Sequence, residues 1–394
     1  MTGAEVIVVG GGLAGMAVAA FLAPEHDVLV VERASGLGTE ASAQNAGMIR
    51  RLGEDPQERA LALRSAAWLS DPPPEFAEAS RVTGALVGLA HDPTHLNDAV
   101  AHLRAAGVRV EAVDRPEEVA PAAAGTHLTR AWWLPDERVA DPRALIEGFT
   151  TVLQRHGGRV RTGTAVRALT LRSGRVTGVE TDEGVLGAEC VVLATGAWSA
   201  VLAARAGLER PLIPVRRTML QTSRGAAWRS EHPWTWIDDV GVYARPDSSG
   251  WLVSGCDETI AFPREAAGST GPLDPVQAAH ALAKLRRHLP QLADVEIRGG
   301  WTGLRTFAPD RRPVLGPDPE CVGLVWAAGL GGYGVTCCVG VGEAIASLLR
   351  DERVGWLRAA ALDPGRPYPR RWPVRGDGTL HRARLRAVRL PDPA

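Results

Sequence analysis

Three glycines near the amino terminus have the spacing of a phosphate-binding turn. Gly10, Gly12 and Gly15 belong to the run Gly-Gly-Gly-Leu-Ala-Gly, which contains the pattern G-x-G-x-x-G. In such a turn the first glycine permits the sharp bend, the second lets the backbone approach a pyrophosphate, and the third lets a helix pack closely on a strand. The pattern alone is a weak signal, because the chain contains 44 glycines. The flanking residues must therefore show whether these glycines form a phosphate-binding turn.

The flanking residues strengthen the motif. A continuous apolar run at 6–9 predicts a buried strand before the glycines, and the small apolar residues 13–23 predict a helix after them. A second apolar run ends at Glu32, whose carboxylate can accept both hydroxyls of a ribose and would repel a 2′-phosphate. The N–H groups at the helix start would face the phosphates. The sequence therefore predicts a dinucleotide-binding βαβ unit, and a tight turn without a ligand is the less favoured alternative.

Composition narrows the class of protein. The chain has 394 residues, of which 45% are apolar and 23% charged, and its formal net charge is −1. These values are typical of a globular protein with two domains, or one domain with a large insertion, and give no sign of a nucleic-acid partner. No apolar run reaches the roughly 18 residues that a membrane-spanning helix requires. With no cleavable apolar segment after the first residues, we expect a soluble cytoplasmic protein.

The cysteines and basic residues suggest no special chemistry. The five cysteines are Cys190, Cys256, Cys321, Cys337 and Cys338. Their odd number and their spacing predict neither a metal site nor a disulfide framework. Adjacent Cys337 and Cys338 invite a redox interpretation, but their apolar surroundings favour buried thiols. Lys284 is the only lysine among many arginines, which is typical of coding bias.

Beyond the first unit, the chain alternates helical and strand-like segments. Asp71 and three prolines end a segment that is mostly helical in composition, and Gly157-Gly158 ends an amphipathic helix that begins at Asp141-Pro142. The arginine- and proline-rich end favours a solvated, weakly ordered tail over a partner-binding segment. The expected elements are helices at about 40–70, 97–106, 142–157, 275–288 and 339–349, and strands at about 85–89, 160–182 and 190–194.

Longer segments carry more specific patterns than the glycine turn. They are Glu32-Arg33, Ser-Ala-Gln-Asn-Ala-Gly-Met at 42–48, Val166 after a strand, Val-Leu-Ala-Thr-Gly-Ala-Trp at 192–198, Trp-Thr-Gly-Leu-Arg-Thr-Phe-Ala-Pro-Asp at 301–310, Pro-Val-Leu-Gly at 313–316, and Ala-Ala-Gly-Leu-Gly-Gly-Tyr-Gly-Val-Thr at 327–336. In this order and spacing they resemble the D-amino-acid oxidase superfamily of FAD-dependent oxidoreductases over nearly the whole chain. Within it, the sequence looks most similar to glycine oxidases and D-amino-acid dehydrogenases, the D-arginine dehydrogenase branch especially.

The resemblance implies a fold and a division into domains. The fold class is α/β, or α+β overall, with a Rossmann-type FAD-binding domain into which a mixed-sheet substrate domain is inserted. The second sheet should cover the flavin and leave a cavity between the two domains. The expected ranges are 1–80, 141–210 and 309–360 for the FAD-binding domain, 81–140 and 211–308 for the substrate domain, and 361–394 for a basic tail.

The resemblance also implies which residues hold FAD. The run Gly331 to Gly334 would lie against the isoalloxazine ring, and the next helix would point its N-terminus at the pyrimidine side, where the reduced ring is negative. A plain loop entering a buried helix is the alternative. The implied contacts are Gly10, Gly12, Leu13, Ala14, Gly15, Glu32, Arg33, Ser42, Gln44, Asn45, Ala46, Gly47, Met48, Val166, Thr195, Gly196, Trp198, Arg305, Gly331, Gly332, Tyr333, Gly334, Val335 and Thr336.

Three residues are implied to meet the substrate. Arg305 matches an arginine of the family's glycine and D-amino-acid enzymes, and a guanidinium presents two parallel donors to a substrate carboxylate. Tyr243 matches a pocket tyrosine of the D-arginine dehydrogenase branch and would donate a further hydrogen bond. Of the matching pair Arg216-Arg217 we favour Arg217, because strand alternation lets only one of two neighbours point inward. The alternatives are a surface salt bridge for Arg305 and a structural role for Tyr243.

Four departures from the relatives carry information. Gly303 stands where sarcosine-oxidase relatives place the cysteine that bonds the flavin, so FAD is expected to be non-covalent. Those relatives also use a lysine to promote reaction with oxygen, whereas Lys284 lies in a charged helix, which favours a slow oxidase or a dehydrogenase. Gly47-Met48 replaces bulkier polar residues of the D-arginine branch. Residues 84–87 stand where that branch offers an acid to a cationic side chain, which argues against a strongly basic substrate.

The expected reaction is oxidation of an amino acid or a related amine. A hydride passes from the carbon that bears the neutral amine to flavin N5, and water hydrolyses the resulting imine. The substrate is a small molecule, and the electron acceptor is oxygen, a quinone or another acceptor. The alternatives are a sarcosine-like secondary-amine oxidase, a 2-hydroxy-acid dehydrogenase of the same superfamily, and a flavin-bound sensor without turnover.

Tryptophans bear on the substrate side chain. Those in the expected substrate domain include Trp132, Trp133, Trp234, Trp236 and Trp251. Most are expected in the core or at the surface. One or two of them in the cavity would favour an apolar or aromatic substrate side chain.

Overall fold

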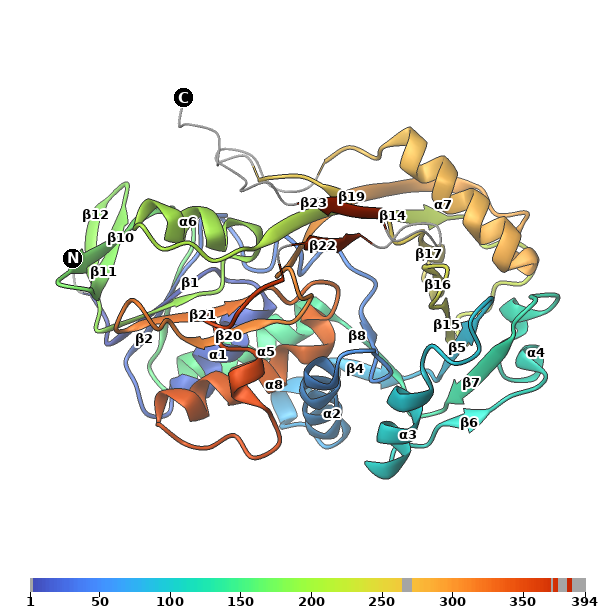
Figure 1. Cartoon of the computed structure of the whole chain (residues 1–394), viewed down its shortest axis with the longest axis horizontal. Helices are drawn as coiled ribbons and strands as arrows, with labels where there is room; N and C mark the ends of the chain where they lie inside the picture. Colours follow the sequence, from blue (N-terminus) through green and yellow to red (C-terminus); the bar gives the residue numbers. More distant parts are fainter. Residues whose placement is uncertain (1–2, 264–270, 370, 375–380, 385–394) are drawn as a thin grey trace.

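The computed structural model describes residues 3–263, 271–369, 371–374 and 381–384. In these ranges the chain forms a six-stranded and a nine-stranded sheet, which occupy opposite ends of the molecule (Figure 1). The expected combination of a Rossmann-type sheet with a mixed sheet is confirmed. No helix in these ranges combines the length and apolar character needed to cross a membrane. The boundaries expected for the two domains stay a prediction.

The six-stranded sheet is built from β1 (Val6–Val9), β2 (Val28–Val31), β9 (Arg159–Arg161), β13 (Cys190–Leu193), β20 (Val314–Pro317) and β21 (Leu324–Ala328). Its order is β20-β21-β13-β1-β2-β9, and all neighbours are parallel except β20 and β21. The central strands are continuous apolar runs because both faces of this sheet are covered. The strand predicted at 6–9 and the one ending before Glu32 are therefore its two central neighbours, β1 and β2.

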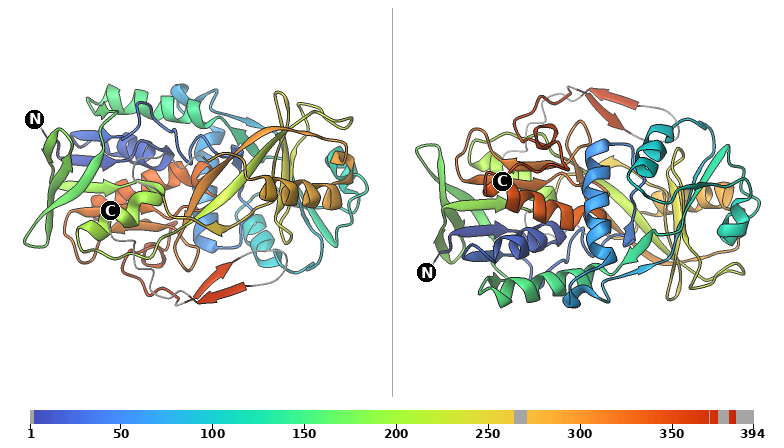
Figure 2. Two further views of the ribbon diagram at one scale, coloured as in Figure 1. Left: turned by 90° about the horizontal axis from the view of Figure 1, so that it is seen from above. Right: turned by 90° about the horizontal axis from the view of Figure 1, so that it is seen from below.

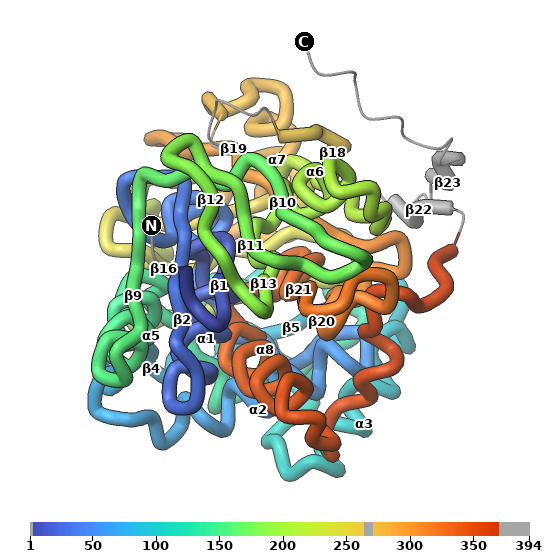
Figure 3. The backbone as a smooth tube through the Cα atoms, turned by 90° about the vertical axis from the view of Figure 1, so that its left-hand side faces the viewer, coloured from blue at the N-terminus to red at the C-terminus, as the bar shows by residue number. Residues whose placement is uncertain are grey.

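Helices and a small sheet cover the two faces. One face carries α1 (Leu13–Leu22), α2 (Pro56–Ser70), α5 (Pro142–Arg155) and α8 (Gly334–Leu349), and the other carries α6 (Ser199–Arg205) with β10 (Val166–Arg172), β11 (Arg175–Thr181) and β12 (Gly184–Gly187). Val6 and Val8 pack against the four helices, whereas Ile7 and Val9 pack against the small sheet and α6. Figure 3 shows α5, α1 and α8 side by side under the central strands. This layering puts the N-termini of α1 and α8 at the carboxyl ends of the strands.

The nine-stranded sheet consists of β5 (Ala85–Leu89), β6 (Glu111–Ala112), β7 (Arg130–Leu134), β14 (Ile213–Thr222), β15 (Trp234–Ile237), β16 (Val242–Asp247), β17 (Gly250–Ser254), β18 (Thr259–Ile260) and β19 (Ile297–Phe307). Its order is β18-β14-β17-β16-β15-β5-β7-β6, and β19 pairs along β14. Only β5 and β15 pair in parallel, so the sheet is mixed. Helix α7 (Pro275–His288) lies across the outer face of β14, β16 and β17 (Figure 2). The inner face turns toward the six-stranded sheet.

The remaining elements are short. They are β3 (Met48–Ile49), β4 (Ser80–Val82), β8 (Arg138–Ala140), β22 (Arg371–Val374), β23 (His381–Arg384), α3 (Asn97–Ala105), α4 (Pro116–Val119), and the 3₁₀ turns η1 (Pro74–Phe76), η2 (Pro121–Ala123), η3 (Gly196–Trp198), η4 (Pro290–Leu292) and η5 (Ala359–Ala361). Much of the tail expected at 361–394 lies outside the described residues. Its first part packs on the protein, since Leu362 is fully buried and Arg366 pairs with Asp310 at 2.8 Å.

Two helices have other bounds than the sequence pattern predicts. Residues 40–54 are not helical, and α2 begins only after Asp55, whose carboxylate accepts the N–H of Gln57 at 2.7 Å. Helix α8 begins at Gly334 rather than near 339, because the glycines that look like a loop in sequence serve its packing. A Cβ on Gly340, for example, would lie 2.8 Å from a carbonyl oxygen of α2.

Candidate functional site

A cavity of about 240 Å³ lies at the carboxyl ends of β1, β2, β13 and β21. In open parallel sheets ligands bind at this edge, next to the helix N-termini. The lining is drawn from the segments 9–14, 31–33, 40–45, 164–167, 194–205, 304–306 and 327–335. Segments that are far apart in the sequence therefore meet in one groove, and β19 of the second sheet closes it.

Most residues expected to contact the cofactor line this cavity. They are Gly10, Gly12, Leu13, Ala14, Glu32, Arg33, Ser42, Asn45, Val166, Thr195, Gly196, Trp198, Arg305, Gly331, Gly332, Gly334 and Val335. Outside the lining are Gly15, Gln44, Ala46, Gly47, Met48, Tyr333 and Thr336. Thr336 donates its hydroxyl to Met48 O at 3.1 Å, which ties the start of α8 to β3. Contact between each of these residues and the cofactor stays a prediction.

The glycine turn has the backbone geometry that a closely bound phosphate needs. Gly10 has a φ of +107°, a region that favours glycine, and a Cβ there would lie 2.6 Å from Ala194 O. A Cβ on Gly15 would lie 1.9 Å from Gly10 O, so α1 can pack here only without a side chain. Leu13 begins α1 and donates its N–H to Ser42 Oγ at 2.9 Å. The positive end of α1 therefore opens into the cavity.

The neighbouring part of the cavity can bind a nucleoside. Glu32 accepts the N–H groups of Gly11 at 2.7 Å and Ala34 at 2.8 Å, which fixes its carboxylate and leaves lone pairs for ribose hydroxyls. The Arg33 guanidinium lies 4.3 Å from the centre of the Trp198 ring. Among the described residues, the buried Trp198 indole N–H has no acceptor, and a bound group would supply one. These residues fit FAD.

Arg217 and Arg305 lie on the inner face of the nine-stranded sheet. In the β14–β19 ladder Arg217 is opposite Gly303 and Arg305 is opposite Val215, so the two arginines are diagonal neighbours on one face. Arg217 is 8% exposed and Arg305 6%, whereas Arg216 is exposed on the other face. Only Arg305 of the three reaches the cavity lining. The fold thus brings two buried guanidinium groups to the edge of the groove.

Arg305 forms no ion pair with an acidic side chain among the described residues. Its Nη1 donates to Leu304 O at 3.0 Å and its Nη2 donates to Gln44 O, and within the described residues it pairs with no carboxylate. Burial, together with the charge of Arg217, lowers the pKa of Arg305 to about 10, so the group is still cationic at neutral pH. A buried cation without a counter-ion is costly. An anionic ligand would offset that cost.

Arg217 and Tyr243 complete this group. Arg217 Nη2 lies 3.2 Å from Glu258 Oε1, and Arg311 lies 2.7 Å from the same oxygen. Tyr243 is 5% exposed, and burial raises its pKa, so its hydroxyl keeps its proton. That hydroxyl donates to Met219 Sδ at 3.0 Å. Because a thioether is a weak acceptor, a carboxylate would be a better partner. We call Arg305, Arg217 and Tyr243 the carboxylate clamp.

An arginine that the sequence did not single out is the centre of another contact group. The Arg50 guanidinium carbon lies 4.1 Å from the ring centre of Trp236 and 4.5 Å from that of Tyr333. Its Nη1 pairs with Asp238 Oδ1 at 3.0 Å, and its Nη2 contacts the Tyr333 hydroxyl. The sequence offered one signal for Arg50, its position two residues after the segment 42–48. That signal does not indicate the direction of the side chain.

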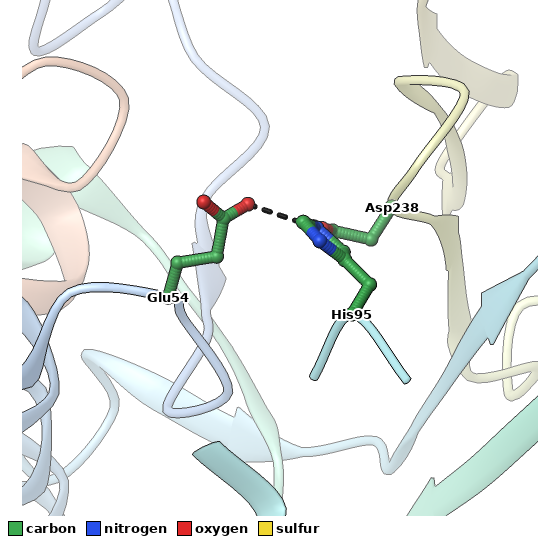
Figure 4. A group of neighbouring side chains, drawn as sticks. All are labelled: Glu54, His95 and Asp238. Atoms are coloured by element: carbon green, nitrogen blue, oxygen red, sulfur yellow. Dashed lines mark hydrogen bonds and ion pairs between the residues drawn. The ribbon is translucent and has the colours of Figure 1, made fainter. Parts of the chain in front are cut away.

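Asp238 has a second partner, His95 (Figure 4). His95 Nε2 lies 3.0 Å from Asp238 Oδ2 and 3.0 Å from Glu54 Oε1. The hydrogen bond to Asp238 raises the pKa of His95, which favours the imidazolium. The three side chains hold potential metal-ligand atoms within 4.8 Å of one another. Because Asp238 already pairs with Arg50, we interpret the group as a chain of ion pairs and propose no metal there.

Two departures from the relatives can be placed in the structure. A Cβ on Gly303 would lie 2.2 Å from Gln44 Oε1, so a cysteine at 303 would displace the Gln44 side chain. The Lys284 ammonium donates to Val240 O at 3.2 Å and to Gly255 O at 3.1 Å, and Lys284 does not line the cavity. Non-covalent binding of FAD stays a prediction, and Lys284 bonds to the loops that follow β15 and β17.

The structure also bears on the expectations for the adjacent cysteines, for the segment 84–87 and for the tryptophans. Burial raises the pKa of Cys337 and that of Cys338, the latter to about 12, so neither is a thiolate at neutral pH. Val87 is opposite Trp236 in the β5–β15 ladder, which leaves an apolar side chain where relatives offer an acid. The tryptophans that are almost completely buried in the core are Trp132, Trp234, Trp251 and Trp326.

Glu58 predicts how stability depends on pH. Its carboxyl is buried at the start of α2, and burial, together with the charge of Asp55, raises its pKa from 4.5 to about 8. The contribution of Glu58 to the free energy of unfolding is therefore fully present below pH 4.5, and it is lost as pH rises through about 8. We expect the Tm measured by calorimetry to fall between about pH 6 and pH 9 in the wild type, and to fall by less in Glu58→Gln. Equal losses in the two proteins would contradict the assignment.

Comparison with known proteins identifies relatives along the chain. The family described as FAD dependent oxidoreductase matches residues 5–348. The bifunctional protein ThiO/ThiG of Synechocystis is 29% identical over 59% of this chain, but the match spans only 34% of that longer protein. A D-amino acid dehydrogenase of Cereibacter sphaeroides is 28% identical over 82% of this chain and 72% of the relative.

Solved structures share the fold. L-proline dehydrogenase from P. horikoshii has a TM-score of 0.81 and 22% identity, and covers 92% of this chain and 97% of its own. Glycine oxidase from Geobacillus kaustophilus has a TM-score of 0.81 and 23% identity, and covers 94% of this chain and 100% of its own. At these identities the likeness concerns the fold, and the chemistry must be argued from the site.

Proposed function

The chain belongs to the family of FAD-dependent oxidoreductases, and we therefore propose that it oxidises the C–N bond of an amino acid or a related amine. The observation that carries the proposal is the carboxylate clamp beside the cavity. Arg305 brings to the cavity lining a buried charge that pairs with no carboxylate in the described part of the chain, and Arg217 is its diagonal neighbour on the same sheet face. A substrate carboxylate would complete this group of donors.

The clamp would hold the substrate by one end. A carboxylate that accepts two parallel N–H groups of Arg305 leaves the α-carbon and the amine on its far side, in one orientation. FAD, held by the glycine turn and Glu32, would supply the two-electron acceptor for the hydride of the α-carbon. As the C–H electron pair leaves, the amine lone pair forms the C=N bond, and the N–H proton passes to solvent. Water then hydrolyses the imine, and oxygen, a quinone or another acceptor takes the two electrons.

Among the described residues, the acidic side chains next to the clamp already have partners. Glu258 is shared by Arg217 and Arg311, and Asp257 accepts the N–H of Thr218 at 2.7 Å and its hydroxyl at 2.9 Å. The amine would therefore have to bind neutral or lose its proton to solvent. We expect the rate of substrate oxidation to rise with pH until the bound amine is deprotonated.

Anaerobic reduction of the yellow holoenzyme tests the proposal. The panel contains D- and L-amino acids, N-methyl amino acids and 2-hydroxy acids, because all three classes offer the same carboxylate. We expect an amino acid to bleach the flavin band, and the speed of recolouring in air to separate an oxidase from a dehydrogenase.

The other outcomes are equally informative. Bleaching by N-methyl amino acids alone would favour a secondary-amine oxidase. Bleaching by 2-hydroxy acids alone would show that the C–N assignment is wrong. If no compound bleached a fully loaded flavin, the catalytic proposal would fail and a sensor without turnover would be favoured.

A further inference from the structure

Four side chains form a continuous stack beside the carboxylate clamp. The rings of Tyr243 and Trp236 are stacked, with centres 4.7 Å apart and planes 20° apart. Arg50 lies over the Trp236 ring at 4.1 Å and over the Tyr333 ring at 4.5 Å. Tyr243 and Arg50 therefore both contact the Trp236 ring. The order is therefore Tyr243, Trp236, Arg50 and Tyr333, and we call these four residues the stacked wall.

The middle of the stacked wall is held by charge. Asp238 pairs with Arg50 at 3.0 Å, and the two side chains are only 4% and 12% exposed. His95 bonds the other oxygen of Asp238, so the carboxylate cannot swing away from the guanidinium without losing a second partner (Figure 4). Arg50 also contacts the Tyr333 hydroxyl. The planar guanidinium is therefore held by Asp238 and lies close to the rings of Trp236 and Tyr333.

The stacked wall connects the two parts of the site. At one end Tyr243 belongs to the carboxylate clamp. At the other end Tyr333 stands between Gly332 and Gly334, which both line the cavity. A substrate whose carboxylate is held by Arg305 and whose α-carbon reaches into the cavity would therefore lie along this wall. Its side chain would meet aromatic rings before any other described group of the sheet face.

Apolar side chains surround Tyr243 at one end of the wall. Met219 and Leu252 belong to the apolar cluster around Tyr243, and Met48 and Trp301 pack against it. Arg50 is paired with Asp238 and Arg217 with Glu258, whereas Arg305 has no carboxylate partner among the described residues. Within the described residues, the buried indole N–H groups of Trp236 and Trp301 lack an acceptor. A charged substrate side chain would lose its hydration here without a free counter-charge among the described residues, whereas an aromatic substrate ring would pack against the aromatic rings of the wall.

We propose that Arg50 is a specificity-determining residue, and that the stacked wall selects carboxylates with an uncharged aromatic side chain. The inference rests on the proposed function for the place of the carboxylate. Arg50 does not touch the reacting atoms in this arrangement. It holds Trp236 and Tyr333 in the orientations against which the ring of the substrate packs.

Ligand binding to the holoenzyme tests this without turnover. Acetate carries the carboxylate alone, and phenylacetate adds one phenyl ring, so the ratio of their Kd values measures recognition of the ring. Both are titrated against the absorbance of the bound flavin. The test variants are Arg50→Lys, which keeps the charge but not the planar group, and Arg50→Met combined with Asp238→Asn, which removes both charges together. Arg64→Met is the control, because Arg64 is half-exposed on α2 and pairs with Glu343.

The expected result is a change in the ratio alone. The wild type and Arg64→Met should bind phenylacetate about tenfold more tightly than acetate, since one aromatic contact in a desolvated site has roughly that effect. Both Arg50 variants should lose most of this preference, while acetate binding stays within about twofold and the FAD content is unchanged. Folding of either variant is sufficient for the comparison.

The contrary results separate the two proposals. If the variants kept the preference for phenylacetate, or if the wild type bound acetate as tightly as phenylacetate, the role of the stacked wall would be overturned while the clamp remained. If neither carboxylate changed the flavin spectrum of the wild type, the carboxylate clamp itself would be wrong, and both proposals would fall.

Discussion

Replacing Arg305 with alanine is expected to lower the second-order rate constant for flavin reduction by an amino acid about a hundred- to a thousandfold. Two charge-assisted hydrogen bonds are lost, and the substrate carboxylate would enter a buried site without its cation. Arg305 is 6% exposed, lines the cavity and has no acidic partner among the described residues, so no other group there needs its charge. Anaerobic stopped-flow measurement of flavin bleaching gives the rate constant directly.

Three controls make this result specific. Arg305→Lys should recover only part of the rate, because an ammonium cannot present two parallel N–H groups. Arg216→Ala removes an exposed arginine from the same ladder and should leave the rate within about twofold. The FAD content must match that of the wild type, since Arg305 also lines the cofactor cavity. An Arg305→Ala protein with full FAD and an unchanged rate would show that the clamp is misassigned.

Replacing Gly12 with valine is expected to yield a folded protein that retains less than about a tenth of its FAD. A Cβ at this position would lie 3.1 Å from Ser42 Oγ, which the backbone can accommodate, but the two methyl groups would occupy the space that a pyrophosphate needs at the start of α1. The ratio of flavin to protein absorbance in the purified protein measures the loss, and circular dichroism reports the fold.

Two further glycines separate cofactor binding from folding. Gly15→Ala should lower Tm as well as FAD content, because its Cβ would lie 1.9 Å from the backbone oxygen of Gly10 and force α1 off the sheet. Gly187→Ala, on β12, has its nearest contact at 3.9 Å and should change neither quantity. If Gly12→Val kept its full FAD content, the assignment of the glycine turn to the pyrophosphate would be untenable.

Much of the fold followed from local patterns. The run Val6–Val9 is apolar at every position, which only a strand covered on both faces requires, and the structure places it in the middle of the parallel sheet. The tight turn at Gly10 and Gly15 could be predicted because only glycine fits the backbone at these two positions. The start of α8 was missed, since the small residues that let it pack against α1 and α2 look like a loop when those partners are unknown.

The carboxylate clamp could be predicted from the sequence, whereas the role of Arg50 in the stacked wall could not. Strand alternation was enough to favour Arg217 over Arg216, because a period of two is a property of a single strand. Arg50 gave no such signal. Its partners Trp236, Asp238 and Tyr333 lie about 190 to 280 residues further along the chain, and their approach depends on how β15 and α8 meet β3.

The sequence by itself therefore determined the βαβ unit and the cofactor class, and it singled out Arg305 as the candidate for a substrate carboxylate; all three depend on short segments with their own backbone or chemical requirement. Only the tertiary structure decided which charges are already paired. Arg217 and Arg50 have carboxylate partners from other elements, whereas Arg305 has none among the described residues. The electrostatic state of a buried side chain depends on neighbours across the fold, and no window of sequence contains them.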